Sequence, residues 1–308
     1  MHYVITGGAG FIGSHLADEL IKSSDVTIID NLSTGRVENI KHLIGRPNVI
    51  FVRGSITDRR VLREAIPGAD GIFHQAAIPS VPKSIEDPLA THEAGITGTL
   101  NVLLAAREFE VKKVVYASSS AVYGDTPTLP KREDMASTPL SPYAVTKLCG
   151  EYYCKVFSDI YDLPTISLRY FNVYGPRQDP TSDYAAVIPK FITSLLTREP
   201  PMIFGDGEQT RDFTYVKDVV DANIRAMESK MRGTYNIAYG EQITINNLAT
   251  ILSDLTEVDV YPIHEPPRPG DIRHSLADIS AAKRAFGYEP KYDLRRGLTE
   301  TLAWYQKY

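Results

Sequence analysis

Short apolar runs and longer stretches of helical periodicity alternate along the chain through about residue 170. The strand-like runs are rich in β-branched residues and lie at Tyr3–Ile5, Val26–Asp30, Val49–Arg53, Gly71–His74, Lys113–Ala117 and Thr165–Arg169. Repeated strand-then-helix order predicts a parallel sheet. Runs such as Val26–Ile29 are unbroken rather than alternating, which is typical of strands buried on both faces. The pattern therefore predicts an α/β fold with a doubly wound parallel sheet of the Rossmann type.

The pattern changes after Gly175. Loop-like segments rich in Pro, Gly and Asp, at residues 175–184, 199–209 and 264–271, surround a few helices. A helix at Val216–Ser229 and a strand at Thr234–Ala238 are predicted to return to the sheet. We therefore expect a smaller C-terminal domain interleaved with the first. Residues 1–175 and 214–240 would form one domain, and residues 176–213 and 241–308 the other.

Composition and charge narrow the range of partners. The chain has 33 Lys and Arg residues against 38 Asp and Glu residues, a formal charge of −5, and no basic run, which argues against nucleic acid as a partner. No apolar stretch reaches the roughly 18 residues of a membrane span. A strand-like segment follows Met1 directly, which leaves no room for a signal peptide. Cys149 and Cys154 face apart on a predicted helix. These features predict a cytoplasmic protein without membrane association.

A glycine-rich loop follows the first predicted strand and opens a helix, with glycines at positions 7, 10 and 13. Glycine permits a tight turn and a close approach of backbone to a pyrophosphate, and the helix N-terminus offers unpaired N–H groups. Asp30 ends the second strand, where a carboxylate can accept hydrogen bonds from both ribose hydroxyls. A carboxylate at this position favours NAD over NADP. Arg36 could accommodate a 2′-phosphate, although a solvated surface arginine is the simpler interpretation.

Tyr143 and Lys147 lie four residues apart, which puts both side chains on one helical face. A tyrosine can act as a base toward an alcohol when an adjacent ammonium and a cationic nicotinamide stabilise its phenolate. The run Ser118-Ser119-Ser120 lies at the carboxyl end of the fifth strand, where this type of sheet binds ligands, and offers hydroxyls for a substrate oxygen. A chance Tyr–Lys pair and a serine-rich turn are the simpler alternatives.

These motifs occur in one order along the chain: the glycine loop, the serines before Val122-Tyr123-Gly124, the Tyr143–Lys147 pair, and Arg169–Arg177. In this the sequence resembles the extended short-chain dehydrogenase/reductase family. It is most similar to the NAD-dependent UDP-glucose/UDP-N-acetylglucosamine 4-epimerases, because their substrate-side motifs recur at Met202–Gly207, Arg211–Phe213 and Arg268–Asp271. The resemblance implies inversion of C4 in UDP-hexoses through a transient 4-keto sugar, with tightly bound NAD.

The resemblance also implies roles for individual residues. The catalytic set would be Tyr143, Lys147 and either Ser119 or Ser120, depending on the alignment. Lys147 would hold the nicotinamide ribose and lower the pKa of Tyr143. The first domain would bind the cofactor through Gly7, Gly10, Phe11, Ile12, Gly13, Asp30, Asn31, Ser33, Thr34, Gly35, Ser55, Ile56, Gln75, Ala76, Ala77, Tyr143, Lys147 and Tyr170. The second domain and neighbouring loops would bind the UDP-sugar through Lys83, Ser84, Ser119, Tyr143, Asn172, Val187, Met202, Phe204, Arg211, Arg268, Asp271 and Ser275.

Two segments distinguish this chain from common family members, and a third position bears on the choice of sugar. Gly54-Ser55-Ile56 places a hydroxyl where a carboxylate usually meets the adenine, and Gly95–Thr99 lacks a customary polar side chain near the cofactor. Ser275 would lie near the sugar 2-position, where a small residue leaves room for an N-acetyl group. The alternatives are preference for acetylated sugars and tolerance of both kinds. We expect activity on UDP-GlcNAc/UDP-GalNAc and also on UDP-Glc/UDP-Gal.

Three other functions require features that differ from those of a 4-epimerase. A nucleotide-sugar 4,6-dehydratase would need acid–base carboxylates where this chain has Ser119-Ser120-Ala121. A decarboxylase would need an extra cation for a sugar acid, and a non-catalytic NAD-binding regulator would not need the Tyr–Lys pair. No metal is expected, since His74 has no partner at ligand spacing. The resemblance further implies a homodimer formed by helices around Thr97–Phe109 and Tyr143–Ile160.

Overall fold

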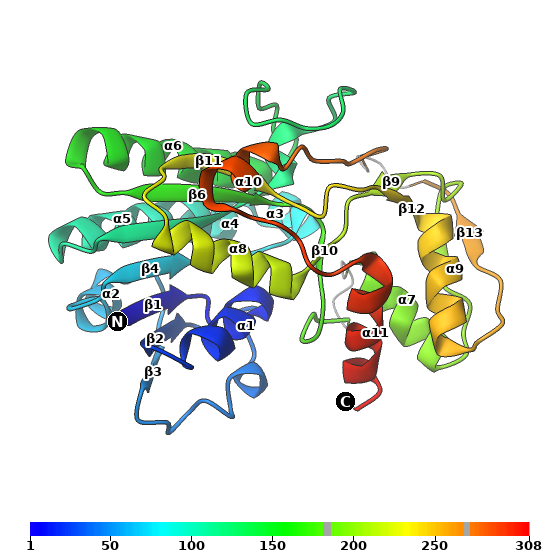
Figure 1. Ribbon diagram of the computed structural model, residues 1–308, viewed down its shortest axis with the longest axis horizontal. Helices are drawn as coiled ribbons and strands as arrows, with labels where there is room; N and C mark the ends of the chain where they lie inside the picture. Colours follow the sequence, from blue (N-terminus) through cyan, green and yellow to red (C-terminus); the bar gives the residue numbers. More distant parts are fainter. Residues whose placement is uncertain (181–185, 268–271, 308) are drawn as a thin grey trace.

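A parallel sheet forms the centre of the computed structural model, which describes residues 1–180, 186–267 and 272–307 (Figure 1). Seven strands within those residues make up this sheet in the order β11-β6-β5-β4-β1-β2-β3. Their bounds are β1 (His2–Thr6), β2 (Asp25–Asp30), β3 (Val49–Arg53), β4 (Gly71–His74), β5 (Lys113–Ser119), β6 (Thr165–Tyr170) and β11 (Gly233–Ile237). The predicted doubly wound sheet is confirmed, as is the late strand that returns to it.

Helices cover both faces of the sheet, so its strands are buried on both sides. Ile5 of β1 packs in a core with α1 (Phe11–Leu20) and α8 (Val216–Glu228). The adjacent Val4 points to the opposite face, into a core with α2 (Arg59–Ala65), α5 (Gly98–Glu108) and α6 (Pro142–Tyr161). Every residue of β4 and β6 is buried. This double burial is the reason for the unbroken apolar runs.

Helix α6 has a strong start signal that fixes the position of Tyr143. The Ser141 hydroxyl caps the helix by accepting a hydrogen bond from the Ala144 N–H at 3.2 Å, and Pro142 occupies the first helical position. Short elements precede it along the chain: η1 (Val37–Asn39), α3 (Val81–Glu86), α4 (Pro88–His92), the π-helical turn η2 (Glu93–Thr97) and the 3₁₀ turn η3 (Ser120–Tyr123). Tyr143 therefore lies in the first turn of α6.

A smaller unit lies beyond the carboxyl ends of the strands, and Figure 1 shows its helices α7, α9 and α11 grouped at the right. It has its own apolar core, which includes Phe191, Leu248 and Leu298. Its elements, with those that connect it to the sheet, are β7 (Val173–Tyr174), α7 (Val187–Leu196), β8 (Met202–Phe204), β9 (Thr210–Arg211), β10 (Thr214–Tyr215), β12 (Ile243–Thr244), α9 (Ile245–Thr256), β13 (Ile263–Glu265), α10 (Ser280–Phe286) and α11 (Leu294–Tyr305).

One late segment packs with the first unit. Ala282 of α10 and Tyr288 belong to the apolar core between the sheet and helices α1 and α8, although they follow the smaller unit along the chain. The exact division into two domains stays a prediction. Both cysteines are free thiols, Cys154 buried and Cys149 half-buried. Among the described residues, no helix is both long enough and apolar enough to cross a membrane.

Candidate functional site

The glycine loop leaves space for a ligand next to the backbone. Gly7 has a φ of +70°, and a Cβ at this position would lie 2.7 Å from the Ala76 Cα. A Cβ on Gly13 would clash with the Gly7 carbonyl. The loop leads into the first turn of α1 at Phe11, where backbone N–H groups are not used within the helix. Side chains are therefore excluded at the point where a helix N-terminus can meet a phosphate.

A cavity of about 920 Å³ opens at this loop and runs along the carboxyl ends of the strands. All of the predicted cofactor residues line it, from Gly7 to Tyr170. Residues that sequence reasoning did not assign to the cofactor also line it: Asn39, Glu93, Arg177, Gln178 and Asp179. Arg177 ends the Arg169–Arg177 motif, and the other four positions belong to no motif that the sequence offered. The cavity is at the large end of the range for small-molecule sites, and its volume suits a dinucleotide.

Asp30 lies at the carboxyl end of β2 with only 7% of its surface exposed. Its two oxygens accept hydrogen bonds from the Ala9 N–H at 2.9 Å and the Leu32 N–H at 2.8 Å. Burial raises the pKa of this carboxyl group, and the two N–H donors oppose that effect. Each oxygen keeps a second lone pair for a ribose hydroxyl. The Arg36 guanidinium is engaged by Asp179 at 2.6 Å, which weakens its case as a 2′-phosphate ligand.

Tyr143 and Lys147 line the same cavity from α6. The Lys147 Nζ donates to the Ala117 carbonyl at 2.7 Å and lies 5.8 Å from the centre of the Tyr143 ring. Burial lowers the pKa of Lys147 to about 8. Burial also raises the pKa of Tyr143, against a smaller lowering by its hydrogen bond with Ser119. Desolvation is the largest effect on the pKa of Tyr143, and the lowering of this pKa by Lys147 stays a prediction.

The three serines of the run have different surroundings. Ser119 ends β5, hydrogen-bonds with Tyr143 and accepts from the Ala121 N–H at 3.2 Å. Ser118 is buried and donates to the Glu151 carboxylate. Ser120 begins the turn η3. Of the two serines proposed for catalysis, Ser119 is therefore the one whose hydroxyl contacts the tyrosine. Nearby His74 is buried between the Thr6 and Thr99 hydroxyls at 2.7 and 2.9 Å, the surroundings of a structural histidine.

A second cavity of about 270 Å³ lies in the smaller unit and shares Ala186 with the first. The residues predicted to hold the nucleotide that line it are Asn172, Val187, Met202, Phe204 and Arg211. Gln209 and Lys190 line it as well and were missed. Gln209 lies two residues before the predicted Arg211, and Lys190 lies one helical turn after Val187, so their spacing was the available signal. The structure thus brings residues from separate loops to one pocket.

Three other predicted substrate residues lie elsewhere in the described part of the chain. Lys83 lines the larger cavity. Ser84 is buried in α3, where its hydroxyl donates to the Val81 carbonyl at 2.6 Å. The Ser275 N–H donates to the Thr210 carbonyl at 3.1 Å, beside Arg211. In the part of the chain that the structure describes, Ser84 and Ser275 line neither cavity. Arg268 and Asp271 lie outside the described residues.

Residues 3–238 match the model of the NAD dependent epimerase/dehydratase family. The chain belongs to this family. Its cofactor is NAD, and the glycine cradle, the volume of the cavity and the Asp30 carboxylate fit this dinucleotide.

Similar proteins of this family act on different UDP-sugars. The UDP-N-acetylglucosamine 4-epimerase of Methanobrevibacter ruminantium, solved with UDP-N-acetylmuramic acid, is 45% identical with a TM-score of 0.97, covering 99% of this chain and 98% of that one. The UDP-glucose 4-epimerase of Thermotoga maritima, solved with UDP-glucose, is 39% identical with a TM-score of 0.95, covering 100% and 99%. A UDP-N-acetyl-alpha-D-glucosaminuronate decarboxylase of Bacillus cytotoxicus is 36% identical, covering 99% and 97%. The chain therefore has the fold and features of a UDP-sugar 4-epimerase, and its substrate is a separate question.

Proposed function

We propose that this protein inverts C4 of UDP-hexoses, interconverting UDP-GlcNAc with UDP-GalNAc and UDP-Glc with UDP-Gal. The observation that carries the proposal is the contact of Ser119 with Tyr143, which lines the cofactor cavity together with Lys147. This cavity shares a wall residue with the pocket that holds Arg211 and Asn172. A base, a nicotinamide site and a nucleotide pocket are thus arranged around one position for a sugar.

The reaction assigns a separate task to each of these side chains. Bound NAD supplies the oxidant that removes hydride from C4 and later returns it. The Tyr143 oxygen takes the proton of the sugar 4-hydroxyl and gives it back, and the Ser119 hydroxyl holds the same sugar oxygen. Lys147 binds the nicotinamide ribose and contributes positive charge beside the phenol. Ser120 is the less favoured serine, because Ser119 is the one in contact with Tyr143.

The nucleotide pocket allows the sugar to turn. Arg211 and Asn172 would hold the diphosphate, with Met202, Phe204 and Val187 around the uracil. The resemblance adds Arg268 for the diphosphate and Asp271 for the ribose. While UDP is held, the 4-keto sugar rotates about its phosphate link, and reduction from the other face inverts the centre. Guanidinium groups suit this task because they bind paired phosphate oxygens in a fixed orientation.

One property of the chain supports epimerisation over elimination of water, and another supports catalysis over a regulatory role. A 4,6-dehydratase moves protons at C5 and C6 with carboxylates, and this chain has Ser120 and Ala121 after Ser119. A non-catalytic regulator would not need Tyr143 next to Ser119. We also propose that the protein is cytoplasmic, since its free cysteines suit a reducing compartment. The family resemblance supports a homodimer.

A panel of UDP-sugars tests the proposal directly. The protein is incubated with UDP-GlcNAc, UDP-Glc and UDP-glucuronate, and the products are identified from their anomeric proton NMR signals. Inversion at C4 of the first two is expected. A 4-keto-6-deoxy product would identify a dehydratase, loss of CO₂ from UDP-glucuronate would identify a decarboxylase, and no product with any sugar would contradict the proposed function.

A further inference from the structure

A buried ion pair joins α6 to β6 one helical turn after Lys147. The Glu151 carboxylate accepts hydrogen bonds from the Arg169 guanidinium of β6 at 2.9 Å (Nε) and 2.7 Å (Nη2). It also accepts a hydrogen bond from the Ser118 hydroxyl of β5. Both charged side chains are only 6% exposed. A buried carboxylate is stable in its charged form when it is paired and hydrogen-bonded in this way.

This pair is connected to Lys147 along both α6 and β5. Glu151 lies one helical turn after Lys147, and Tyr143 lies one turn before it, so the three side chains share one face of the helix. On β5, the Ala117 carbonyl holds the Lys147 Nζ, and the next residue, Ser118, holds Glu151. The lysine and the glutamate are thus fixed by consecutive residues of one strand.

Among the groups around Lys147, Glu151 is the one whose charge favours the protonated ammonium. Burial is the largest influence on the pKa of Lys147 and lowers it, whereas the negative charge of Glu151 raises it. From β4, burial lowers the pKa of His74 to about 3, which keeps that ring neutral. From β5, the Tyr116 ring lies 5.2 Å from the Lys147 Nζ. The positive charge of Arg169, from β6, is neutralised by its pairing with Glu151.

Other charged side chains line the same cavity as Lys147, among them Asp30, Arg36, Arg177 and Asp179. Glu93 of η2 and Lys83 of α3 line it as well. They are of opposite sign and belong to exposed positions, so solvent screens them more than it screens the buried pair.

We propose that Glu151, clamped by Arg169 and Ser118, is a positioning residue that keeps the Lys147 ammonium charged and fixed beside Tyr143. Within the run of serines, Ser118 then serves the lysine through Glu151, and Ser119 serves the tyrosine. The ion pair acts only through Lys147, because neither Glu151 nor Arg169 lines the cavity. The role in turnover rests on the proposed function, whereas the effect on Lys147 can be measured without substrate.

Titration of Lys147 tests the proposal. Lysine is labelled with ¹³C at Cε, and the Lys147 signal is assigned by its absence in Lys147→Ala. In Glu151→Gln the midpoint of the Lys147 titration should fall by about one pH unit or more, since a buried counter-charge is lost while Arg169 remains. Ser118→Ala should lower it in the same direction by a smaller amount. Asp159→Asn, which removes the carboxylate of an exposed ion pair on the same helix, is the matched control and should leave the midpoint unchanged.

Turnover provides the second measurement. If a charged Lys147 is needed, the alkaline limb of the kcat profile of Glu151→Gln should move to lower pH, with the KM for UDP-sugar unchanged. An unchanged Lys147 midpoint in Glu151→Gln would overturn the proposal. If that variant does not fold, an unchanged midpoint in Ser118→Ala would do the same. Failure of the wild type to turn over any UDP-sugar would contradict the proposed function alone, because the Lys147 titration is independent of it.

Discussion

Tyr143 has to lose a proton in surroundings that favour the neutral phenol. Burial raises its pKa, and among the protein's own groups the Ser119 hydroxyl opposes that effect. The Lys147 ammonium is close to the Tyr143 ring, at 5.8 Å from its centre, but does not offset desolvation. A cationic nicotinamide next to the phenol adds the charge that these side chains lack. Proton transfer by Tyr143 is therefore expected to depend on the bound cofactor.

Replacement of Tyr143 by Phe should abolish turnover while UDP-sugar binding is retained. The variant loses the base and keeps the ring, and general-base catalysis contributes about 10²- to 10⁴-fold in rate. The nucleotide pocket does not include Tyr143, so binding energy from that pocket is unaffected. Steady-state kinetics give kcat, and isothermal titration calorimetry gives the Kd for UDP-GlcNAc. Tyr152→Phe, at an exposed position on the same helix, is the control. Near-normal kcat in the Tyr143 variant would contradict the mechanism.

Replacement of Ser275 by Tyr should remove activity on the acetylated sugars and leave UDP-Glc/UDP-Gal turnover. The family resemblance implies that this residue lies near the sugar 2-position. A small side chain there leaves room for an N-acetyl group, and a large ring would fill that room. Ser275→Ala, which stays small, should retain both activities. The comparison is kcat/KM for both sugar pairs in all three proteins. A Tyr variant that still processes UDP-GlcNAc would show that position 275 does not control the pocket.

Some site residues could be predicted from the sequence and others could not. Gly7, Asp30 and Tyr143 belong to local motifs with a fixed place relative to strands and helices, and they line the cavity as expected. Glu151 gave no such signal, because a glutamate on a helix is normally solvent-exposed. Its burial depends on Arg169 and Ser118, which come from two other elements. Only tertiary structure brings these three together.

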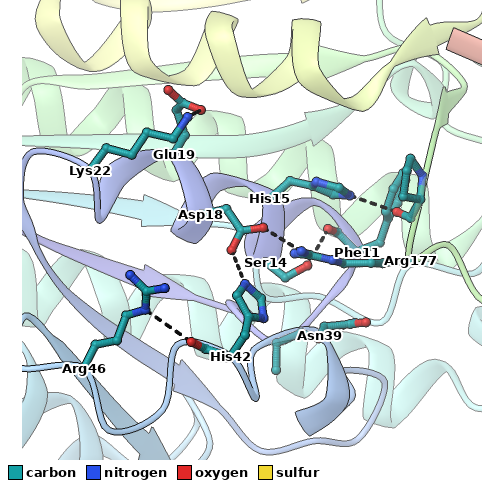
Figure 2. Close-up of polar contacts among 12 residues, drawn as sticks. Phe11, Ser14, His15, Asp18, Glu19, Lys22, Asn39, His42, Arg46 and Arg177 are labelled. Atoms are coloured by element: carbon teal, nitrogen blue, oxygen red, sulfur yellow. Dashed lines mark hydrogen bonds and ion pairs between the residues drawn. The ribbon is translucent and has the colours of Figure 1, made fainter. Parts of the chain in front are cut away.

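At the scale of elements, the segment after β7 forms one wall of the cofactor cavity and is held from several sides. Figure 2 shows His15 and Asp18 extending from α1 toward it. The His15 Nε2 donates to the Pro176 carbonyl at 2.9 Å, and Asp18 accepts from Arg177 at 2.6 Å. Asp179 pairs with Arg36 from the loop after β2. From α11, the Tyr305 hydroxyl donates to the Gln178 carbonyl. These contacts link the two units across the cofactor site.

Loss of the Arg36–Asp179 pair should therefore speed the release of NAD. Both side chains are partly exposed, so the pair contributes modestly, and Asp179→Asn should raise the NAD dissociation rate by about two- to fivefold. In the wild type the rate should rise with salt, because ions screen the pair. The rate is measured by trapping released NAD with a coupled dehydrogenase. Asp254→Asn, in the exposed pair with Arg295, is the control. An equal rate in both variants would contradict the role of Asp179.

His15 makes the same junction sensitive to acid. Burial lowers its pKa to about 4, with a further lowering by Arg177, whereas an unfolded histidine titrates near its ordinary value of 6.5. Between pH 6.5 and 4 the unfolded chain therefore binds a proton that the folded chain does not. Neutral, buried His15 therefore contributes its full stabilisation of the folded state above pH 6.5. As the pH falls from 6.5 to 4, the free energy of unfolding decreases by up to about 3 kcal/mol. His74 adds a loss of the same sign.

Urea unfolding at several pH values checks this linkage. His15→Gln retains a donor for the Pro176 carbonyl, and its free energy of unfolding should fall less steeply below pH 6.5 than that of the wild type. If His15→Gln and the wild type lose stability in parallel between pH 6.5 and 4, His15 is not the group responsible.

Among the elements, the long periodic ones were predictable and the shortest were not. The six early strands and α8 match their apolar runs closely, because burial on both faces imposes a clear pattern. The two- and three-residue pairings β7–β10, β9–β12 and β8–β13 build the smaller unit and have no periodicity to detect. The packing of α10 into the core on the α1 and α8 side of the sheet was also unexpected. This helix has only seven residues, and its sequence does not indicate which distant elements it contacts.

At the scale of the molecule, α6 presents an apolar stripe to solvent. Val145, Tyr152, Val156 and Ile160 are 47%, 61%, 42% and 68% exposed and lie on one side of the helix. Ile85 and Leu89, on α3 and α4 next to α6, are exposed as well. Contiguous apolar surface of this kind typically marks an interface. Its position on α6 agrees with the homodimer that the family resemblance implies.

Ile160→Lys should therefore separate the proposed dimer. Pairing of two α6 helices would bury Ile160 at a symmetric contact, where each chain places the same residue, so one substitution introduces two charges into the interface. Sedimentation velocity at micromolar concentration should give the mass of two chains for the wild type and of one chain for Ile160→Lys. Tyr261→Lys removes an even more exposed large side chain from the smaller unit and should remain dimeric. Because Tyr143 begins the same helix, the kcat of the separated chains shows whether dimerisation also stabilises the active site. A wild type that sediments as one chain would exclude this interface.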